Sequence, residues 1–291
     1  MDKKTNLSLR DFIEINLAML LLGTSGPFGK LIELPVPLTI GIRATFAFAI
    51  LFLYCKWRGV SFRLRRRDML PVIISGVLMC VHWTSYFKAL QLSNVAIGML
   101  SLFTYPVMTA FLEPFFLKTK FQKIHLLLAL LVIWGIYFLV PDFSLDNGYT
   151  VAIGFGLFSA LCYAIRNLIL KTKVDRYNGS ILMTHQLAIT AFLLFPVYFL
   201  YDLGPVPTQW QGLAGLVIIT TVLGHTLFIN TFKHFSITTV SIISSIQPVY
   251  GIVIGALFLS EVPSWSTVFG GLLILTSVVV ESVRSYKGTT G

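Results

Sequence analysis

Two histidines inside apolar segments are the residues of this sequence best suited to proton chemistry. The stretch VHWTSYFKAL, Val81 to Leu90, holds His82 and Tyr86 four residues apart, which puts both side chains on one face of a helix. His225 lies 143 residues after His82, in another apolar segment. Imidazole changes its charge near neutral pH. A buried pair could therefore couple to protons, and the alternative for each ring is a structural hydrogen bond.

Two prolines, Pro106 and Pro248, also lie inside apolar segments and should kink the helices that contain them. In a membrane, a carbonyl freed by such a kink must bond to a neighbour, a water or a ligand. Four polar side chains within a turn or two of the kinks supply donors and are candidates for substrate binding: Ser101, Tyr105, Ser244 and Gln247.

The composition indicates that these residues are carried by membrane-spanning helices. Hydrophobic residues make up 56% of the 291-residue chain and charged residues 12%, whereas a typical soluble domain has roughly 25% charged residues. Runs of about 20 apolar residues, the length that an α-helix needs to cross a bilayer, recur along the chain. We therefore predict an all-α, multi-pass integral membrane protein that contacts lipids.

Apolar runs that end at charged residues, proline or glycine predict ten transmembrane helices. Their ranges are 12–30, 37–55, 69–87, 95–116, 124–140, 149–170, 180–200, 209–232, 237–259 and 265–283.

The basic residues predict the orientation of these helices. With both termini in the cytoplasm, the inner segments hold 18 of the 22 Lys and Arg residues, and the outer connections hold only Lys30 and Lys88. The positive-inside rule then predicts cytoplasmic termini, in the inner membrane of a bacterial cell. Because the net charge of +10 lies in short loops, it does not indicate a nucleic-acid partner. The other two cations, Arg43 and Arg166, lie inside spans, where a charge usually faces a cavity or a partner.

No cofactor, metal or disulfide is expected. The three cysteines, Cys55, Cys80 and Cys162, lie in or beside apolar runs without C-x-x-C spacing, so we interpret them as buried free thiols. The histidines lack metal-ligand spacing, which argues against an integral membrane enzyme. Every lysine lies at the end of a span, which argues against a retinal protein with a mid-span Schiff base.

The chain contains an internal repeat, which divides it into units 1–145 and 146–291 with five predicted spans each. LGTSGPFGK aligns with YAIRNLILK at a shift of 141 residues, RATFAFAILF with QLAITAFLLF at 143, and YPVMTAFLEPFFL with QPVYGIVIGALFL at 142. Because five is odd, the second unit must enter the membrane from the opposite side. Inverted repeats are the architecture of many secondary transporters, which bind substrate near the midplane and expose it alternately to the two sides.

The chain resembles the EamA-like members of the drug/metabolite transporter superfamily along nearly its whole length. The stretches that carry the resemblance are LLLGTSGPFGKL, IGIRATFAFA, YFKALQLSNVAIGMLSLFTYPV and TFKHFSITTVSIISSIQPVYGIVIGALFLSE. Pro248 followed thirteen residues later by Glu261 resembles the family's second-repeat signature. The first repeat departs from that pattern, because Thr119 stands at the position that matches Glu261 and Leu22 stands where an aromatic residue is usual.

The resemblance implies a central cavity lined by spans 1, 3, 4, 6, 8 and 9. Tyr163, Arg166 and Asn167 lie on the sixth span, so Arg166 is the candidate to meet a negative group of the substrate. Its alternative is to extend toward the cytoplasmic interface. Arg43 lies on the second span, which is peripheral in the implied fold. We therefore expect a structural role for Arg43 rather than that of a carboxylate anchor.

Other side chains of these spans are expected to be structural. Trp83 and Phe87 should pack between helices or face lipid. Glu113, which precedes Pro114, should cap a neighbouring helix or pair with Lys118 or Lys120.

The function that follows is secondary active transport of a small molecule by alternating access, not an enzymatic reaction. Export of small polar metabolites is the leading hypothesis, with amino acids as the first substrate class and protons as the candidate coupling ion. Import or exchange of another metabolite, such as a nucleoside, an S-adenosylmethionine-like compound or a nucleotide sugar, remains an open alternative.

Overall fold

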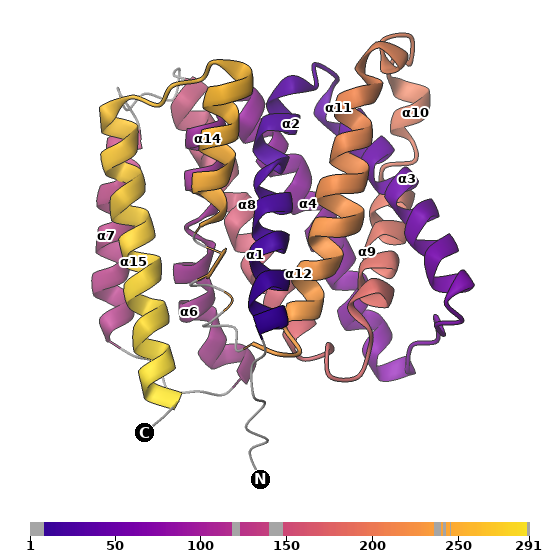
Figure 1. Cartoon of the computed structure of the whole chain (residues 1–291), viewed down its shortest axis with the longest axis horizontal. Helices are drawn as coiled ribbons and strands as arrows, with labels where there is room; N and C mark the ends of the chain where they lie inside the picture. The colour runs from indigo at the N-terminus through magenta and orange to yellow at the C-terminus, as the bar shows by residue number, and fades with distance from the viewer. Residues whose placement is uncertain are drawn as a thin grey trace.

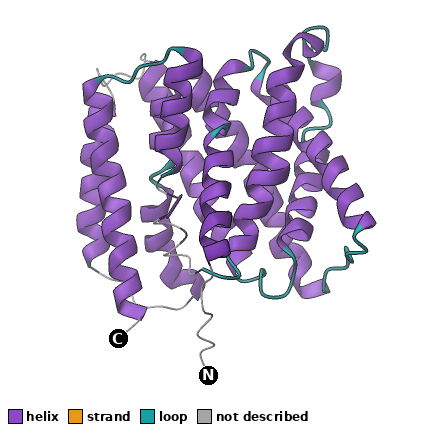
Figure 2. Ribbon diagram, in the orientation of Figure 1, coloured by secondary structure: helices purple, strands orange, loops and turns teal. Residues whose placement is uncertain are grey.

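The structure is a computed structural model that describes residues 9–117, 123–139, 148–235, 240, 243–244 and 246–289. Helices make up nearly all of this part of the chain, and it contains no strand (Figure 2). The predicted all-α class is therefore confirmed.

The helices follow the chain in this order: α1 Leu9–Gly23, α2 Ser25–Leu31, α3 Val36–Trp57, α4 Arg66–Leu92, α5 Val95–Leu102, α6 Tyr105–Leu117, α7 Ile124–Leu139, α8 Gly148–Lys171, α9 Gly179–Leu193, α10 Val197–Leu200, the 3₁₀ helix η1 Val206–Gln209, α11 Trp210–Gly215, the π-helix η2 Leu216–His225, α12 Thr226–Thr231, α14 Gln247–Leu259 and α15 Trp265–Thr289.

Six helical stretches within the described residues are long and apolar enough to cross a membrane, so the chain is a multi-pass membrane protein. They are Val36–Trp57, Arg66–Leu92, Val95–Phe116, Gly148–Lys171, Gly179–Leu200 and Val206–Thr231. Shorter apolar helices, Leu126–Leu139, Gln247–Leu259 and Trp265–Val280, stand beside them. The first turn of α1 and the last turn of α15 lie at the same end of the bundle (Figure 1).

Several predicted spans are interrupted helices. The first divides at Thr24 into α1 and α2, and the hydroxyl of Thr24 donates to the carbonyl of Leu21 at 2.6 Å. The fourth divides between Leu102 and Tyr105 into α5 and α6. There the hydroxyl of Thr104 donates to the carbonyl of Ser101 at 2.8 Å. Side-chain hydroxyls thus satisfy carbonyls that an unbroken helix would pair with backbone N–H groups.

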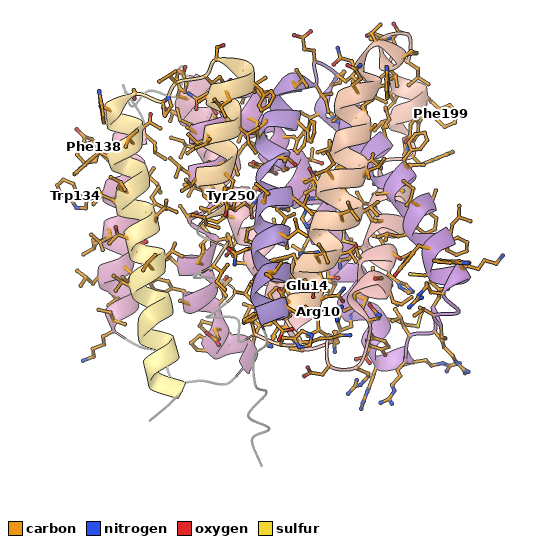
Figure 3. The ribbon with its side chains drawn as sticks, in the orientation of Figure 1. Arg10, Glu14, Trp134, Phe138, Phe199 and Tyr250 are labelled. Atoms are coloured by element: carbon orange, nitrogen blue, oxygen red, sulfur yellow. The ribbon has the colours of Figure 1, made fainter. Side chains whose placement is uncertain are left out.

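The surface of the bundle is apolar and its interior carries polar and charged side chains. Trp134 on α7 is 60% exposed and Phe199 on α10 is 77% exposed, and both point away from the bundle (Figure 3). Arg43 and Arg166 are completely buried. This distribution suits a lipid environment, because the apolar side chains contact lipid and the charged side chains are buried inside the bundle.

Long-range helix pairs build the bundle. α4 packs against α8, α3 against α9, and α1 against η2 and α12. At one edge α7 and α15 lie side by side (Figure 1). Their backbones approach closely at two glycines: a Cβ atom on Gly270 would lie 2.6 Å from the carbonyl oxygen of Gly135. Small residues at such contacts allow close packing in lipid, where no hydrophobic effect drives helices together.

Two lysines cap the C-terminal ends of helices on other parts of the chain. Nζ of Lys30, at the end of α2, donates to two carbonyls at the C-terminal end of α4. One is that of Leu90 in the last turn, at 3.3 Å, and the other is that of Ser93 just after the helix, at 2.6 Å. Nζ of Lys171, at the end of α8, donates to the carbonyls of Phe232 at 2.8 Å and Phe235 at 3.4 Å, just after α12. Both ammonium groups therefore meet the negative end of a helix dipole.

An ion cluster joins the start of α4 to the segment between α8 and α9. The carboxylate of Asp68 accepts from Nζ of Lys173, from Nη1 of Arg176 at the same 2.9 Å, and from the hydroxyl of Tyr177 at 2.8 Å. The Tyr177 hydroxyl also accepts from the backbone N–H of Arg65 at 3.1 Å. Because Asp68 is buried, these donors replace the water that the carboxylate loses.

Candidate functional site

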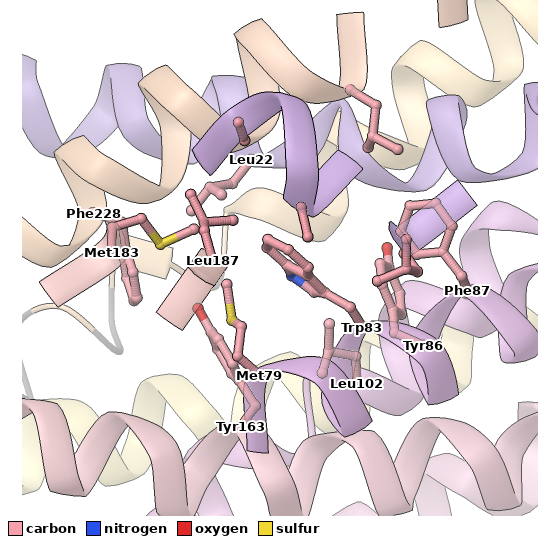
Figure 4. Close-up of a cluster of buried hydrophobic side chains, with 14 of the residues drawn as sticks. Leu22, Met79, Trp83, Tyr86, Phe87, Leu102, Tyr163, Met183, Leu187 and Phe228 are labelled. Atoms are coloured by element: carbon pink, nitrogen blue, oxygen red, sulfur yellow. The ribbon is translucent and has the colours of Figure 1, made fainter. Parts of the chain in front are cut away.

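A small cavity lies in the interior among the helices α1, α2, α4, α5, α8, η2 and α14. Its volume is about 20 Å³, which is room for about one water molecule. Leu22, Trp83 and Tyr163 approach this region from α1, α4 and α8 (Figure 4). The cavity is lined by Leu22, Ser25, His82, Trp83, Tyr86, Leu102, Phe103, Tyr163, His225 and Gln247.

Five of the side chains that the sequence singled out for substrate binding meet at this cavity. They come from four separate helices: His82 and Tyr86 from α4, Tyr163 from α8, His225 from η2 and Gln247 from the start of α14.

His82 is held in one orientation by α8. Its Nδ1 atom lies 2.7 Å from the hydroxyl of Ser159, and that hydroxyl is 2.9 Å from the carbonyl of His82 itself. Nδ1 also lies 3.3 Å from the carbonyl of Ser159, which can only accept, so all of these contacts are satisfied when Nδ1 carries the ring proton and donates. In the neutral ring, Nε2 is then the acceptor. The ring also stacks on Tyr163, with 4.5 Å between centroids.

His225 and Trp83 form the opposite part of the wall. Their ring centroids are 5.3 Å apart, and both side chains are buried. On the other side Trp83 meets Arg43, whose Cζ atom is 3.6 Å from the centroid of the indole. Trp83 is 1% exposed, so it packs between helices, as one of the two sequence expectations had it, and does not face lipid. It also lines the cavity.

Arg43 is fixed by the π-helix η2. The hydroxyl of Thr221 donates to the carbonyl of Leu216, five residues earlier, at 2.8 Å and accepts from Nε of Arg43 at 2.7 Å. The wider π-turn places this hydroxyl where it can bridge α3 and η2. π-Helices are rare and are frequently found at functional sites.

Arg166 lies near Tyr163, with its Cζ atom 5.6 Å from the ring centroid. Its Nε donates to the side chain of Gln186 on α9 at 2.7 Å, and Nη1 donates to Asn167 at 2.9 Å. The arginine therefore stays in the interior and does not extend toward the cytoplasmic interface. Asn167 serves as an acceptor for Arg166 and is not part of the cavity lining.

Five buried polar atoms in and directly behind the cavity wall have no hydrogen-bond partner among the described residues. They are Nη1 and Nη2 of Arg43, Nη2 of Arg166, Nδ1 of His225 and the hydroxyl oxygen of Tyr86. Ser25 is a polar neighbour of the Tyr86 hydroxyl, without the geometry of a bond. Because buried polar groups are normally paired, this group of atoms can bind a ligand rich in acceptors.

The other predicted site residues lie away from the cavity lining. Ser101 is buried between α5 and α8, and its hydroxyl donates to the carbonyl of Gly98 at 3.0 Å. Tyr105 and Ser244 share a hydrogen bond of 2.9 Å that joins the start of α6 to the residues before α14. The ring of Tyr105 contacts Tyr163 edge-on, so it supports the lining from behind.

The two prolines begin helices. Pro106 is the second residue of α6 and Pro248 the second residue of α14. A proline is well accommodated there, because the first N–H groups of a helix have no intrahelical partner. Glu113 is half-buried in α6. Its expected partners Lys118 and Lys120, and Thr119 of the repeat comparison, lie outside the described residues.

Ser159, Gln186 and Thr221 hold the site residues and were not singled out from the sequence. Gln186 had a signal, since the repeat aligns it with Arg43. Ser159 and Thr221 had none, because a hydroxyl in an apolar helix usually bonds its own backbone.

Comparison with known proteins agrees with this architecture. The chain is 25% identical over 255 residues to the pseudopaline exporter CntI of Pseudomonas aeruginosa, with 88% of each chain covered. It is 28% identical over 216 residues to an uncharacterized transporter of Archaeoglobus fulgidus, covering 72% of this chain and 75% of the relative. The uncharacterized transporter YxxF of Bacillus subtilis is 23% identical, with 94% and 89% covered.

A solved crystal structure has the same fold, with a TM-score of 0.70 at 18% identity, over 94% of this chain and 98% of the other. The EamA-like transporter family matches residues 13–140 and again residues 150–283. The names of these relatives indicate transporters. The chain therefore belongs to the EamA-like transporter family, within the drug/metabolite transporters.

Proposed function

We propose that the protein is a secondary active transporter that exports small polar metabolites, amino acids first among them, by alternating access. The observation that carries the proposal is the buried cavity between His82 and His225, with Arg43 and Arg166 behind its walls and unpartnered polar atoms around it. Aromatic rings enclose these groups, so a polar substrate would be held by a few convergent contacts within an apolar frame.

Alternating access is supported by the size of the cavity. At about 20 Å³ it has no room for an amino acid, so a substrate can enter only if helices separate. The interrupted helices beside it, α1 with α2 and α5 with α6, are places where such a movement can bend the chain. His82 and His225 are the proposed proton carriers, and Pro106 and Pro248 mark the proposed bends.

Ten spans arranged as two inverted units, 1–145 and 146–291, form the proposed framework. In such a repeat each of the first five predicted spans corresponds to the span five places later. The contact of α4, the third span, with α8, the sixth, then corresponds to the contact of η2 and α12, the eighth span, with α1, the first. Both contacts are present. The contacts of α3 with α9 and of α7 with α15 each join two corresponding spans, so an exchange of corresponding spans leaves these contacts unchanged.

The two lysine caps follow the same rule. Lys171 lies 141 residues after Lys30, and its acceptors Phe232 and Phe235 lie 142 residues after Leu90 and Ser93. The matching family segments, 13–140 and 150–283, also support two units.

We place the protein in the inner membrane of a bacterial cell with cytoplasmic termini. The basic loops supply the reason, since the segments on the proposed inner side carry 18 of the 22 Lys and Arg residues. The direction of transport rests on the relative named an exporter.

Counterflow in proteoliposomes tests the proposed function. Vesicles that hold the purified full-length protein and an unlabelled compound should accumulate the same labelled compound from outside. A panel of amino acids, nucleosides and nucleotide sugars at two pH values covers the alternatives. Accumulation of an amino acid in protein-containing vesicles, but not in empty ones, is the expected result. No accumulation of any compound in the panel would overturn the proposal.

A further inference from the structure

We propose that the preferred substrate carries two carboxylates, one met by Arg43 and the other by Arg166, and that these two arginines select it over its neutral amide analogues. This inference rests on the proposed transport function and narrows its substrate class. The observation behind it is that both guanidinium groups are completely buried, lie against rings that line the same cavity, and keep unpartnered N–H groups.

Both arginines act on one site. Each lies within electrostatic range of both His82 and His225, the two imidazoles that line the cavity. Arg43 reaches the site from α3, behind Trp83, and Arg166 reaches it from α8, beside Tyr163. Two positive charges from different helices therefore lie against two rings of the cavity wall, those of Trp83 and Tyr163.

Each arginine keeps at least one terminal nitrogen without a hydrogen-bond partner among the described residues. Arg43 uses only Nε, toward Thr221, so that both terminal nitrogens remain free. Arg166 uses Nε and Nη1, toward neutral side-chain oxygens, so that Nη2 remains free. A carboxylate matches the planar fork of a guanidinium better than any neutral acceptor does.

No carboxylate of the described residues compensates these two charges. The cavity lining holds no Asp or Glu side chain. Asp68 is the buried acid of the described part of the chain, and it is engaged by Lys173 and Arg176 at the end of the bundle. Two uncompensated guanidinium groups inside a membrane are unfavourable, and a substrate with two carboxylates would neutralise both.

A neutral amino acid satisfies this site less well. Its single carboxylate can pair with one arginine, and the second keeps its charge and its free N–H groups. The unpartnered Nδ1 of His225 and the aromatic walls can still receive an amine. An acidic amino acid and a simple dicarboxylate are therefore both members of the proposed class.

Matched pairs of compounds test the inference in proteoliposomes of the full-length protein. Glutamate and glutamine, aspartate and asparagine, and succinate and succinamate each differ by one charge at nearly constant shape. Each compound competes against counterflow of a labelled substrate from the panel. We expect the dicarboxylate of each pair to compete at least about tenfold better, since about 1.4 kcal/mol corresponds to that ratio.

Two variants assign the preference to the arginines. Arg43→Gln and Arg166→Gln should each reduce the ratio within a pair to near one, and Arg58→Gln, at an exposed arginine just after α3, should keep it. Thermal unfolding shows whether each variant is folded. If a variant does not fold, two measurements on the wild type still test the substrate preference. They are the competition ratio within each pair, and the shift in unfolding temperature caused by glutamate compared with the shift caused by glutamine.

The outcomes separate this inference from the proposed function. Equal competition within every pair, or better competition by the amide, would overturn the inference while transport itself stands. A preference for dicarboxylates that survives in both folded arginine variants would overturn the assignment to Arg43 and Arg166. Absence of flux for every compound would instead overturn the proposed function.

Discussion

The guanidinium of Arg43 stacks on the indole of Trp83, with 3.6 Å between the Cζ atom and the ring centroid. This contact joins α3 to α4, and the bond from Arg43 to Thr221 extends it to the π-helix η2. Because Trp83 also lines the cavity, the arginine is connected to the proposed substrate site through one ring. A residue from a span that the resemblance made peripheral is thus part of the site's support.

Replacement of Trp83 should show how much the stack contributes. We expect Trp83→Ala to lower the free energy of unfolding by roughly 3 kcal/mol, because it removes a large buried ring and leaves Arg43 without its platform. Trp83→Phe should lose less, since a ring still faces the guanidinium. Thermal unfolding of the purified protein in detergent measures both. Equal stability of the alanine variant and the wild type would show that the stack is not a structural support.

His82 and His225 are expected to carry the pH dependence of transport. His82→Gln and His225→Gln should flatten the dependence of counterflow on pH between about 5 and 8, because glutamine keeps hydrogen bonding but does not titrate. The charged groups that face both rings are Arg43 from α3 and Arg166 from α8, and neither changes its charge in this range.

His185 offers a matched control for these two variants. It lies on α9, outside the cavity lining, and its Nδ1 contacts the carbonyl of Ile181 at 2.8 Å. His185→Gln should leave the pH profile unchanged. If the profiles of His82→Gln and His225→Gln are also unchanged, both histidines are structural.

The ion cluster around Asp68 should stabilise the closed contact between α4 and the segment after α8. Asp68→Asn keeps the shape of the side chain but removes its charge from Lys173 and Arg176. We expect a loss of about 2 kcal/mol, since bonds to a charged group are the stronger ones and both cations are partly exposed. Chemical denaturation reports this loss. Asp202→Asn is a suitable reference, because Asp202 is exposed and its carboxylate accepts only from the backbone N–H of Gly204 among the described residues.

Gly156 should be intolerant of any side chain. A Cβ atom there would overlap the hydroxyl oxygen of Ser101, so α5 and α8 would have to separate. Gly156→Ala should therefore destabilise the protein by about 1–3 kcal/mol.

A second substitution tests the cause of that loss. Ser101→Gly removes the atoms that clash, so the double variant Gly156→Ala with Ser101→Gly should regain stability relative to Gly156→Ala alone. Thermal unfolding of the four proteins in this cycle gives the coupling. A coupling of zero would mean that the two positions do not compete for the same space.

Composition and local pattern were enough to predict a helical membrane protein, and transport was predicted from the internal repeat and the family resemblance. A low content of charged residues and runs of apolar residues are properties of each segment alone, and they follow from the thickness of the bilayer. The same pattern made His82, Arg43, Arg166 and His225 conspicuous, because charged and titratable groups are rare in such segments. Six membrane-length helices and the family match confirm this class.

Which side chains meet at the cavity could not be predicted in this way. Ser159 lies 77 residues from His82, and Thr221 lies 178 residues from Arg43, so each pair depends on how distant helices pack. In a soluble protein an apolar stripe shows which face of a helix is buried, but a helix in lipid is apolar on every face. Packing then depends on small residues, shape and single hydrogen bonds. The position of Trp83 under Arg43 and the π-turn at Thr221 are products of that packing, and they appear only when the helices are assembled.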